Sequence, residues 1–395
     1  MYPNLYFAFK DLFGVEWPFL RFVNSFGFFV AISFVLAAIV LAAELKRKSS
    51  DGLLKPTEMQ VMVGSPATAT ELILNFLLGF LLGFKILALF IMDSSATEDP
   101  QAFIFSTIGS WPAGILVGLV FAGLKWYEKN KQKLPKPEKK TVRIWPQDRV
   151  GEMTVLALVF GLVGAKVFDI FENWSDFLKH PSSYLLSPSG LTFYGGLICA
   201  AIAIWVYARK HNIGLWHLND AAAPALMLAY ATGRIGCQVA GDGDWGVANH
   251  SPKPFSWLPD WMWAYKYPHN VNEVDTKIPG CVGKYCYELG EAAWPTPFYE
   301  TIVCLILFGI LWSLRKKLKT PGTLFALYLM FNGIERFFIE KIRVNTRLNL
   351  FGFQPTQAEV ISTLLFLTGL FLWFYLKKKE RDPKSTSAGP DQGAK

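Results

Sequence analysis

Nine apolar stretches, each long enough to cross a lipid bilayer as a helix, follow one another along the 395 residues of this chain. The hydrocarbon core of a bilayer requires about 20 predominantly apolar residues per helix. Hydrophobic residues make up 52% of the chain and aromatic residues 15%, which is too apolar for one soluble domain. We therefore predict an all-α polytopic membrane protein with about nine transmembrane helices.

The segments between and beside these helices are polar or aromatic. The predicted helices cover roughly residues 19–43, 70–92, 104–126, 151–172, 190–208, 219–240, 297–314, 322–341 and 357–376. Residues 1–18 form an aromatic-rich N-terminal lead, and residues 381–395 a polar tail that we expect to be disordered. Residues 242–294 hold many turn formers and no long apolar run, which predicts a small extracytoplasmic segment. The predicted transmembrane domain is therefore residues 19–380.

Basic residues are concentrated in four short clusters beside predicted helix ends. The net charge is +8, and the clusters lie at residues 46–48, 131–140, 315–319 and 377–381. Lys and Arg are enriched in the cytoplasmic loops of membrane proteins. Nine helices with the N-terminus outside and the C-terminus in the cytoplasm place all four clusters in the cytoplasm. The positive charge thus indicates membrane orientation, and we expect no nucleic-acid partner.

Two of the five cysteines, Cys281 and Cys286, bracket four residues of the predicted extracytoplasmic segment. A disulfide persists outside the cytoplasm, and no partner ligands for a metal are close in sequence, so we favour a disulfide over a metal pair. Cys199 and Cys304 lie in apolar runs, which is typical of buried structural cysteines.

The second and fourth predicted helices resemble each other in sequence. The twenty residues that start at Glu71 align with the twenty that start at Glu152. Apolar runs match by chance, but a lysine in register at similar depth favours a duplication. We therefore predict that residues 70–149 are a two-helix insertion. The other pairs in register are Gly83 with Gly164, Lys85 with Lys166, and Phe90 with Phe171.

Two arginines lie inside predicted transmembrane helices. Arg234 is near the outer end of the sixth helix and Arg336 is in the outer half of the eighth. A charged side chain in hydrocarbon costs about 2.5 kcal/mol or more and normally faces a polar cavity. At a rise of about 1.5 Å per residue, both arginines fall at the height of Tyr194 in the fifth helix. Guanidinium groups suit phosphate oxygens, and phospholipid phosphate is the anion available there.

Acidic residues accompany the arginines at this level. Glu340 follows Arg336 by one helical turn and is a candidate to orient it or to accept a proton. Asp242 and Asp244 lie in the Gly-rich turn after the sixth helix, and Glu300 opens the seventh helix. The sequence therefore predicts a polar site near the extracytoplasmic boundary.

A purely structural explanation is open for each of these residues. The shared depth of groups from three helices favours a functional site over that explanation. The structural alternatives are an interhelical ion pair for Arg336 and Glu340, an interfacial belt for Tyr194, turn geometry for Asp242 and Asp244, and helix packing for Gly195 and Gly196.

Several motifs occur in an order that resembles the prolipoprotein diacylglyceryl transferase family. The resemblance covers the first helix, where Asn24 to Gly27 are similar to the family pattern, and most of residues 151–376. It implies a core of seven helices, which the predicted insertion raises to nine. The motifs are GLTFYGGL (190–197), GRIG (233–236) followed by WG (245–246), PTPFYE (295–300), NGIERFFIE (332–340) and QPTQAEVIS (354–362).

The resemblance implies a reaction and its partners. A diacylglyceryl group passes from phosphatidylglycerol to the thiol of a prolipoprotein lipobox cysteine, the first step of bacterial lipoprotein maturation, and glycerol phosphate is released. Phosphatidylglycerol, prolipoprotein signal peptides and the lipid bilayer are then the partners. The phosphate ester supplies the leaving group and the thiol the nucleophile, so no metal or other cofactor is needed. We expect a monomer in the bacterial inner membrane.

The same resemblance assigns residues. Arg234 and Arg336 match two arginines that bind the lipid phosphate and stabilise the leaving group, and Gly246 matches the last glycine of the family signature. The candidate phosphatidylglycerol-binding residues are Arg234, Arg336, Gly195, Gly196 and Gly246. The candidate catalytic residues are Arg234, Arg336, Tyr194, Glu340, Asp242, Asp244 and Glu300.

The chain departs from the family pattern at several positions. Because an unperturbed tyrosine has a pKa near 10, Tyr194 is a poor base, and Asp242, Asp244 and Glu300 become candidates to form the thiolate. None of the five histidines lies in a matching motif. The departures are Tyr194 in place of histidine, Cys237 and Ala240 in place of asparagine, Phe26 and Asn332 in place of tyrosine, and one extra residue in the turn at 242–245.

Two other classes of function remain open. A catalytically silent relative that binds phospholipid or a signal peptide would suit the missing histidine and asparagines. A transporter is disfavoured, because the charged groups cluster near one face of the membrane and not at mid-membrane between inverted repeats.

Overall fold

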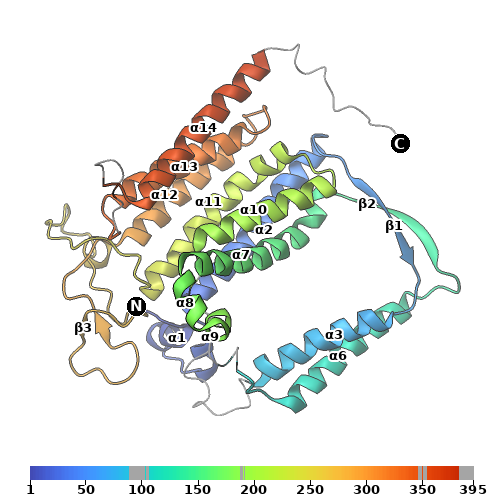
Figure 1. Cartoon of the computed structure of the whole chain (residues 1–395), viewed down its shortest axis with the longest axis horizontal. Helices are drawn as coiled ribbons and strands as arrows, with labels where there is room; N and C mark the ends of the chain where they lie inside the picture. Colours follow the sequence, from blue (N-terminus) through green and yellow to red (C-terminus); the bar gives the residue numbers. More distant parts are fainter. Residues whose placement is uncertain are drawn as a thin grey trace.

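Helices dominate the computed structural model, which describes residues 1–88, 103, 106–186, 190, 192–345, 349 and 354–381. Three short helices are α1 (Leu5–Phe13), α8 (Trp174–Lys179) and α9 (Pro181–Leu186). The prediction of an all-α polytopic fold is confirmed (Figure 1). Within the described residues, the nine helices of 14 residues or more are α2 (Ser25–Ser50), α3 (Ala69–Leu82, continued by a π-helical turn, Gly83–Leu87), α6 (Trp111–Lys131), α7 (Val150–Glu172), α10 (Phe193–Lys210), α11 (Leu215–Ala240), α12 (Thr296–Leu314), α13 (Thr323–Glu340) and α14 (Gln357–Arg381).

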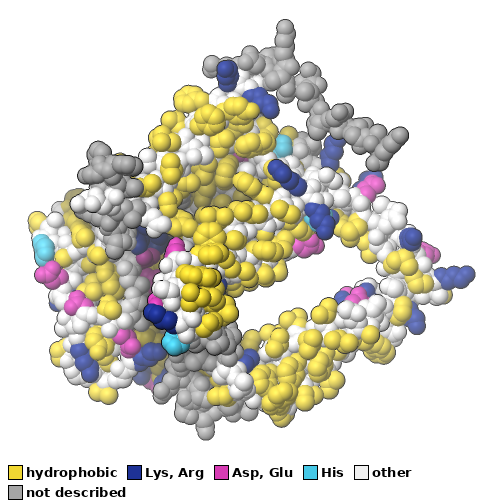
Figure 2. Space-filling view, viewed as in Figure 1, with side chains coloured by type: hydrophobic (Ala, Val, Ile, Leu, Met, Phe, Trp, Pro, Cys, Tyr) yellow, Lys and Arg dark blue, Asp and Glu magenta, His cyan; other side chains and the backbone are white. Residues whose placement is uncertain are grey.

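Several helical stretches are long and apolar enough to cross a membrane. In the part of the chain that the structure describes there are five: Ser25–Ser50, Ala69–Leu87, Pro146–Glu172, Thr296–Leu314 and Gln357–Glu380. Figure 2 shows hydrophobic side chains along the sides of the helices, as contact with lipid requires. The chain is a multi-pass membrane protein, and the count of nine spans stays a prediction.

The first long helix shows why observed and predicted boundaries differ. It was predicted at 19–43 but runs from Ser25 to Ser50. Residues 18–22 form a 3-10 turn, and the Asn24 side chain caps the helix by accepting from the Gly27 amide at 3.3 Å. At the other end, Glu44 is buried and pairs with Arg47 at 2.5 Å and with Arg315 at 3.2 Å. These polar contacts extend the helix past its apolar run.

Helix α11 lies at the centre of the main group of helices and packs against α2, α12 and α13. Small residues on α11 permit close approach: a Cβ on Gly236 would lie 3.0 Å from Phe29 of α2. Helices α2, α10, α12 and α14 begin, and α7, α11 and α13 end, at the lower left of Figure 1. We call this end of the molecule the site end.

A hairpin of α3 and α6 stands beside this group (Figure 1). A Cβ on Gly83 would lie 2.4 Å from the Ala113 carbonyl oxygen of α6, just as one on Gly164 of α7 would lie 2.6 Å from the Gly195 carbonyl oxygen of α10. The lysines in register add a second likeness, and the duplication stays a prediction. Lys85 donates to the carbonyl oxygens of Phe103, Ser106 and Ile108, and Lys166 donates to that of Gly190.

A two-stranded antiparallel ribbon joins the hairpin to the rest of the chain. Strand β1 (Thr57–Val63) pairs with β2 (Glu138–Ile144), and Thr57 lies opposite Ile144. The sequence analysis predicts no strands here, because strands this far apart in the sequence leave no local signal of their pairing. Residues 89–102 and 104–105, which include the predicted end of the second helix and the predicted start of the third, lie outside the described residues.

Residues 242–294 form a small polar unit at the site end. Tyr267, Leu289 and Ala293 make its core, and strands β3 (Thr276–Lys277) and β4 (Tyr287–Glu288) pair within it. Cys281 and Cys286 form a disulfide, as predicted. The tail was predicted to be disordered from residue 381, but Arg381 ends α14, and residues 382–395 lie outside the described residues.

Candidate active site

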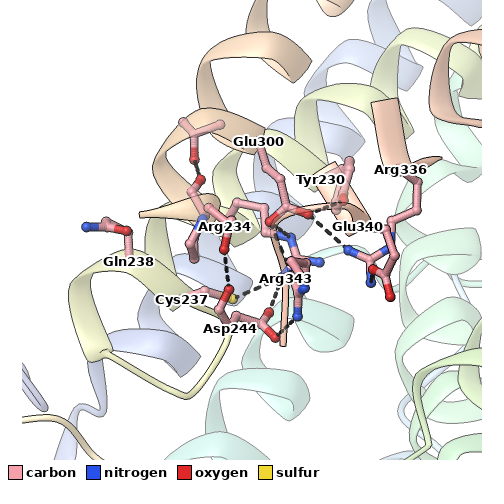
Figure 3. A network of polar contacts seen from close by, with 12 residues as sticks. Tyr230, Arg234, Cys237, Gln238, Asp244, Glu300, Arg336, Glu340 and Arg343 are labelled. Atoms are coloured by element: carbon pink, nitrogen blue, oxygen red, sulfur yellow. Dashed lines mark hydrogen bonds and ion pairs between the residues drawn. The ribbon is translucent and has the colours of Figure 1, made fainter. Parts of the chain in front are cut away.

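Three arginines converge on one buried glutamate at the site end (Figure 3). Glu300 of α12 has no exposed surface. Its carboxylate lies 3.1 Å from Arg234 Nε of α11, accepts a hydrogen bond from Arg336 Nη1 of α13 at 3.1 Å, and lies 3.5 Å from Arg343 Nη1. The prediction that Arg234 and Arg336 lie at one level is confirmed, because a single carboxylate contacts both. A buried carboxylate among three cations is a site where an anion can be bound or exchanged.

The ends of three helices place these side chains. Pro297 lies in the first turn of α12, where a missing amide hydrogen is tolerated, and Glu300 follows one turn later. Tyr230, one turn before Arg234 on α11, donates its hydroxyl to Glu300 Oε1 at 3.0 Å. The Arg234 guanidinium lies 5.1 Å from the centre of the Tyr230 ring. The tyrosine therefore fixes both partners of the ion pair.

The Gly-rich turn after α11 brings a second carboxylate to the arginines. One oxygen of Asp244 accepts from Arg234 and the other from Arg343. Gly243 has a φ of 98°, in the left-handed region that favours glycine. Thr296 holds the turn by donating to the Asp244 carbonyl oxygen at 2.6 Å. The turn is thus folded so that one carboxylate bridges two arginines.

Gly246 permits the close contact between this turn and the segment after α13. A Cβ at Gly246 would lie 2.4 Å from the Ile342 carbonyl oxygen and 2.8 Å from Trp294 Cβ. Gly246 also forms an isolated antiparallel bridge with Arg343. The glycine predicted to bind substrate therefore positions Arg343, and any larger residue would push the two segments apart.

The two aspartates of the turn differ in electrostatic environment. Burial raises the pKa of Asp242, and the charge of Asp244 raises it further. Burial also opposes ionisation of Asp244, but Arg234 and Arg343 outweigh it and lower the pKa of Asp244. The environment therefore favours the ionised form more strongly at Asp244 than at Asp242.

Cys237 lies beside these aspartates. Its sulfur is 3.8 Å from Arg234 Nη1, and ligand atoms of Cys237, Asp242 and Asp244 lie within 4.8 Å of one another. A metal ion at this position would compete with the two guanidinium groups that already bind Asp244. The donor set therefore suits an arginine-bound anion site better than a cation site.

Glu340 contacts Arg336 one helical turn away. Its Oε2 lies 3.1 Å from Arg336 Nη2, and its Oε1 accepts from Asn345 Nδ2 at 2.6 Å. The residue is 3% exposed. Glu340 and Glu300 thus each contact a different terminal nitrogen of the Arg336 guanidinium group.

Three predicted residues on α10 lie apart from this cluster. Gly195 and Gly196 face α7, where a Cβ would lie 2.4 Å from Phe168 and 2.8 Å from the Gly161 carbonyl oxygen, respectively. Tyr194 is half-buried and its ring contacts Phe193. Among the described residues, no hydrogen bond or ion pair joins Tyr194 to the arginines. Helix packing accounts for the contacts of both glycines.

Arg343 and Tyr230 are site residues that the sequence analysis did not select. Arg343 follows Arg336 by seven residues, which is close to two helical turns. Helix α13 ends at Glu340, however, so this spacing is not a repeat along one helical face. Arg343 escaped notice because it follows the helix end, where arginine is common.

Comparison with known proteins agrees with this geometry. The family model described as prolipoprotein diacylglyceryl transferase matches residues 104–375, which include α6 of the predicted insertion. Three curated relatives share the name phosphatidylglycerol–prolipoprotein diacylglyceryl transferase. They come from Dehalococcoides mccartyi (28% identity over 60% of this chain and 80% of the relative), Shouchella clausii (26%, 63% and 82%) and Leptospira interrogans (26%, 60% and 81%). A match over more than half of the chain, together with the arginine site, shows that the chain belongs to the prolipoprotein diacylglyceryl transferase family.

Proposed function

We propose that this protein transfers the diacylglyceryl group of phosphatidylglycerol to the thiol of a prolipoprotein lipobox cysteine. The names of its relatives describe this reaction. The observation that carries the proposal is the convergence of Arg234, Arg336 and Arg343 on Glu300 at one end of the transmembrane helices. Several desolvated guanidinium groups at a lipid-accessible depth suit a phospholipid phosphate.

The reaction places new charge beside these arginines. The thiolate sulfur bonds to the terminal glycerol carbon of the diacylglyceryl group, and the bond from that carbon to the phosphate oxygen breaks. The phosphate oxygen keeps the electron pair, so a phosphodiester with one negative charge becomes glycerol phosphate with close to two. Donors that meet the developing charge lower the barrier more than they tighten substrate binding.

Charge balance indicates how phosphate enters the site. The three guanidinium groups are matched by the carboxylates of Glu300, Asp244 and Glu340, so an incoming phosphate competes for their N–H groups. Arg343 retains donors for it: its side chain is 8% exposed, and its Nε and Nη1 are buried without a hydrogen-bond partner. We therefore add Arg343 to Arg234 and Arg336 as a phosphate ligand.

Asp242 is the proton acceptor that we propose for the substrate thiol. Glu300 is bound by three arginines and Asp244 by two, so the carboxylate oxygens of both are already occupied. Within the described residues, Asp242 has no arginine hydrogen bond, and burial raises its pKa. It therefore replaces the histidine absent at Tyr194. Tyr194, Gly195 and Gly196 remain candidates for contact with the lipid or the peptide.

We also propose an orientation, with the N-terminus outside and the C-terminus in the cytoplasm. In this orientation, phosphatidylglycerol of the outer leaflet of a bacterial inner membrane meets a translocated prolipoprotein at the site end. The basic clusters then face the cytoplasm. We propose that the active unit is a monomer.

Mass spectrometry tests the activity directly. Purified protein is incubated with phosphatidylglycerol and a synthetic lipobox peptide, and we expect the peptide to gain one diacylglyceryl mass. Arg234→Ala should abolish the gain, and full activity in that variant would refute the assignment. Complementation of bacteria depleted of their own transferase excludes the alternative of a catalytically silent lipid- or signal-peptide-binding relative.

A further inference from the structure

Residues 251–262 form a loop that exposes aromatic side chains at the site end. We call it the aromatic loop. Trp257 is 74% exposed and Phe255 is 57% exposed, and their rings stack with centroids 5.6 Å apart. Large exposed apolar side chains that lie next to each other usually mark a surface that contacts something else.

The aromatic loop is held in one shape by its own hydrogen bonds. Lys253 Nζ donates to the Leu258 carbonyl oxygen at 3.3 Å and to Asp260 at 2.5 Å. The base is closed by Trp263 Nε1, which donates to the Ser251 carbonyl oxygen at 2.9 Å. The chain therefore fixes Phe255 and Trp257 in exposed positions and does not fold them inward.

The base of the aromatic loop lies where α12 begins. The Tyr299 hydroxyl donates to the Met262 carbonyl oxygen at 2.8 Å, and the rings of Trp261 and Phe298 are 5.0 Å apart. Phe298 and Tyr299 lie in the first turn of α12, about 3 and 4.5 Å from its start at 1.5 Å per residue. Since α12 is apolar enough to cross the membrane, the loop lies at the level where that helix leaves the hydrocarbon.

A second aromatic cluster lies at the same end of the molecule, beside α2. Trp17 and Phe13 are 49% and 68% exposed, and Trp17 stacks on Phe9. This cluster is tied to the start of α2 by the hydrogen bond from the Ser25 amide to the Pro3 carbonyl oxygen at 3.1 Å. Two transmembrane helices therefore carry Trp and Phe at the same boundary, where aromatic residues are enriched in membrane proteins.

We propose that the aromatic loop inserts Phe255 and Trp257 into the lipid headgroup region of the leaflet at the site end. The occupant of the exposed surface is the bilayer itself, because the loop continues the boundary set by α2 and α12. The nearest charges, Lys253 and Asp260, are paired with each other, so no unpaired charge in the loop opposes insertion. The unit 242–294 then rests on the membrane through this loop, and the proposal does not depend on the proposed reaction.

Site-directed spin labelling tests the proposal. The full-length chain with Cys199→Ser, which leaves the buried Cys237 and Cys304 in place, receives Trp257→Cys and a nitroxide. It is reconstituted in nanodiscs of phosphatidylethanolamine and phosphatidylglycerol, and collisions with oxygen and with a water-soluble nickel chelate are measured. We expect a label at 257 to collide mainly with oxygen. The matched control is Lys277→Cys on the exposed strand β3, where collisions with nickel should dominate.

Each outcome decides the proposal. Nickel accessibility at 257 equal to that at 277 would overturn it, and so would a label that becomes shielded only when a lipobox peptide is added, since the peptide would then be the occupant. Phe255→Cys provides a second labelling position if Trp257→Cys fails to fold, and it should give the same oxygen-rich signature.

Discussion

Arg343 and Asp244 form an ion pair although they lie 99 positions apart in the sequence. The pair joins the turn after α11 to the segment after α13, and Asp244 also binds Arg234. One carboxylate thus fixes the distance between two arginines from different elements. The arginines are therefore preorganised before any lipid arrives, which is the condition for electrostatic stabilisation of a transition state.

Arg343→Met should reduce turnover by about 10²-fold, the usual effect of removing one transition-state donor. The inhibition constant of glycerol 1-phosphate should rise by a similar factor, because the Arg343 guanidinium binds the doubly charged phosphate of the product more strongly than the singly charged phosphate of the substrate. For the same reason, KM for phosphatidylglycerol should change less. Lys341→Met is the matched control, since Lys341 is exposed and pairs with Glu359. Equal inhibition constants in the two variants would contradict the role given to Arg343.

Glu300→Gln should destabilise the protein by about 3–5 kcal/mol, the usual cost of breaking a buried ion pair, because three arginines lose a shared counter-ion. Thermal unfolding in detergent measures the change. The control is Glu291→Gln, whose side chain is 69% exposed beside His250, and we expect no shift in its unfolding temperature. Unchanged stability in Glu300→Gln would mean that the arginines find other partners.

Asp242→Asn should remove the acid limb of the pH–rate profile and lower kcat. A base works only when ionised, so activity falls as the pH drops through the pKa of Asp242. Because burial raises that pKa, the wild-type limb should lie above the ordinary aspartate value of about 3.9. Asp242→Glu should restore much of the rate with a displaced limb. A wild-type limb that persists in Asp242→Asn would assign the base to another group.

Gly246→Ala should abolish activity and destabilise the protein by about 1–3 kcal/mol, the usual cost of overpacking. The new methyl group would meet the Ile342 carbonyl oxygen and Trp294, both held by backbone hydrogen bonds. Gly309→Ala on α12 is the control, since a Cβ there has no neighbour within 4 Å. Transfer assays and thermal unfolding on both variants compare the two effects, and normal activity in Gly246→Ala would show that the segments can separate freely.

Some site residues were predictable because their burial is chemically unusual. Arg234 and Arg336 stand in apolar runs, and Glu300 opens one, so each signals a polar site without knowledge of the fold. Arg343 carries no such signal, because it lies beyond the end of α13. Tyr230 is also inconspicuous, since tyrosines are common in transmembrane helices and only packing shows that its hydroxyl meets Glu300.

For the fold, too, local sequence patterns predict some features, and contacts between residues far apart in the sequence determine the others. The apolar runs predict where helices form, to within a few residues at most ends. Polar contacts such as those of Glu44 with Arg47 and Arg315 extend a helix beyond its apolar run, and no local pattern reports them. The position of Tyr194 likewise depends on how α10 rotates against α7, which Gly195 and Gly196 set through contacts with that helix.

The pairing of β1 with β2 brings the two ends of the α3–α6 hairpin side by side. Thr57 and Ile144 lie opposite each other in the ribbon. The chain therefore enters and leaves the hairpin at two points that are one interstrand spacing apart, about 5 Å. A linker of two or three residues is long enough to join these two points without moving α2 or α7. Deletion of the hairpin between these two points should therefore leave the arginines at the opposite end of α2 in their positions.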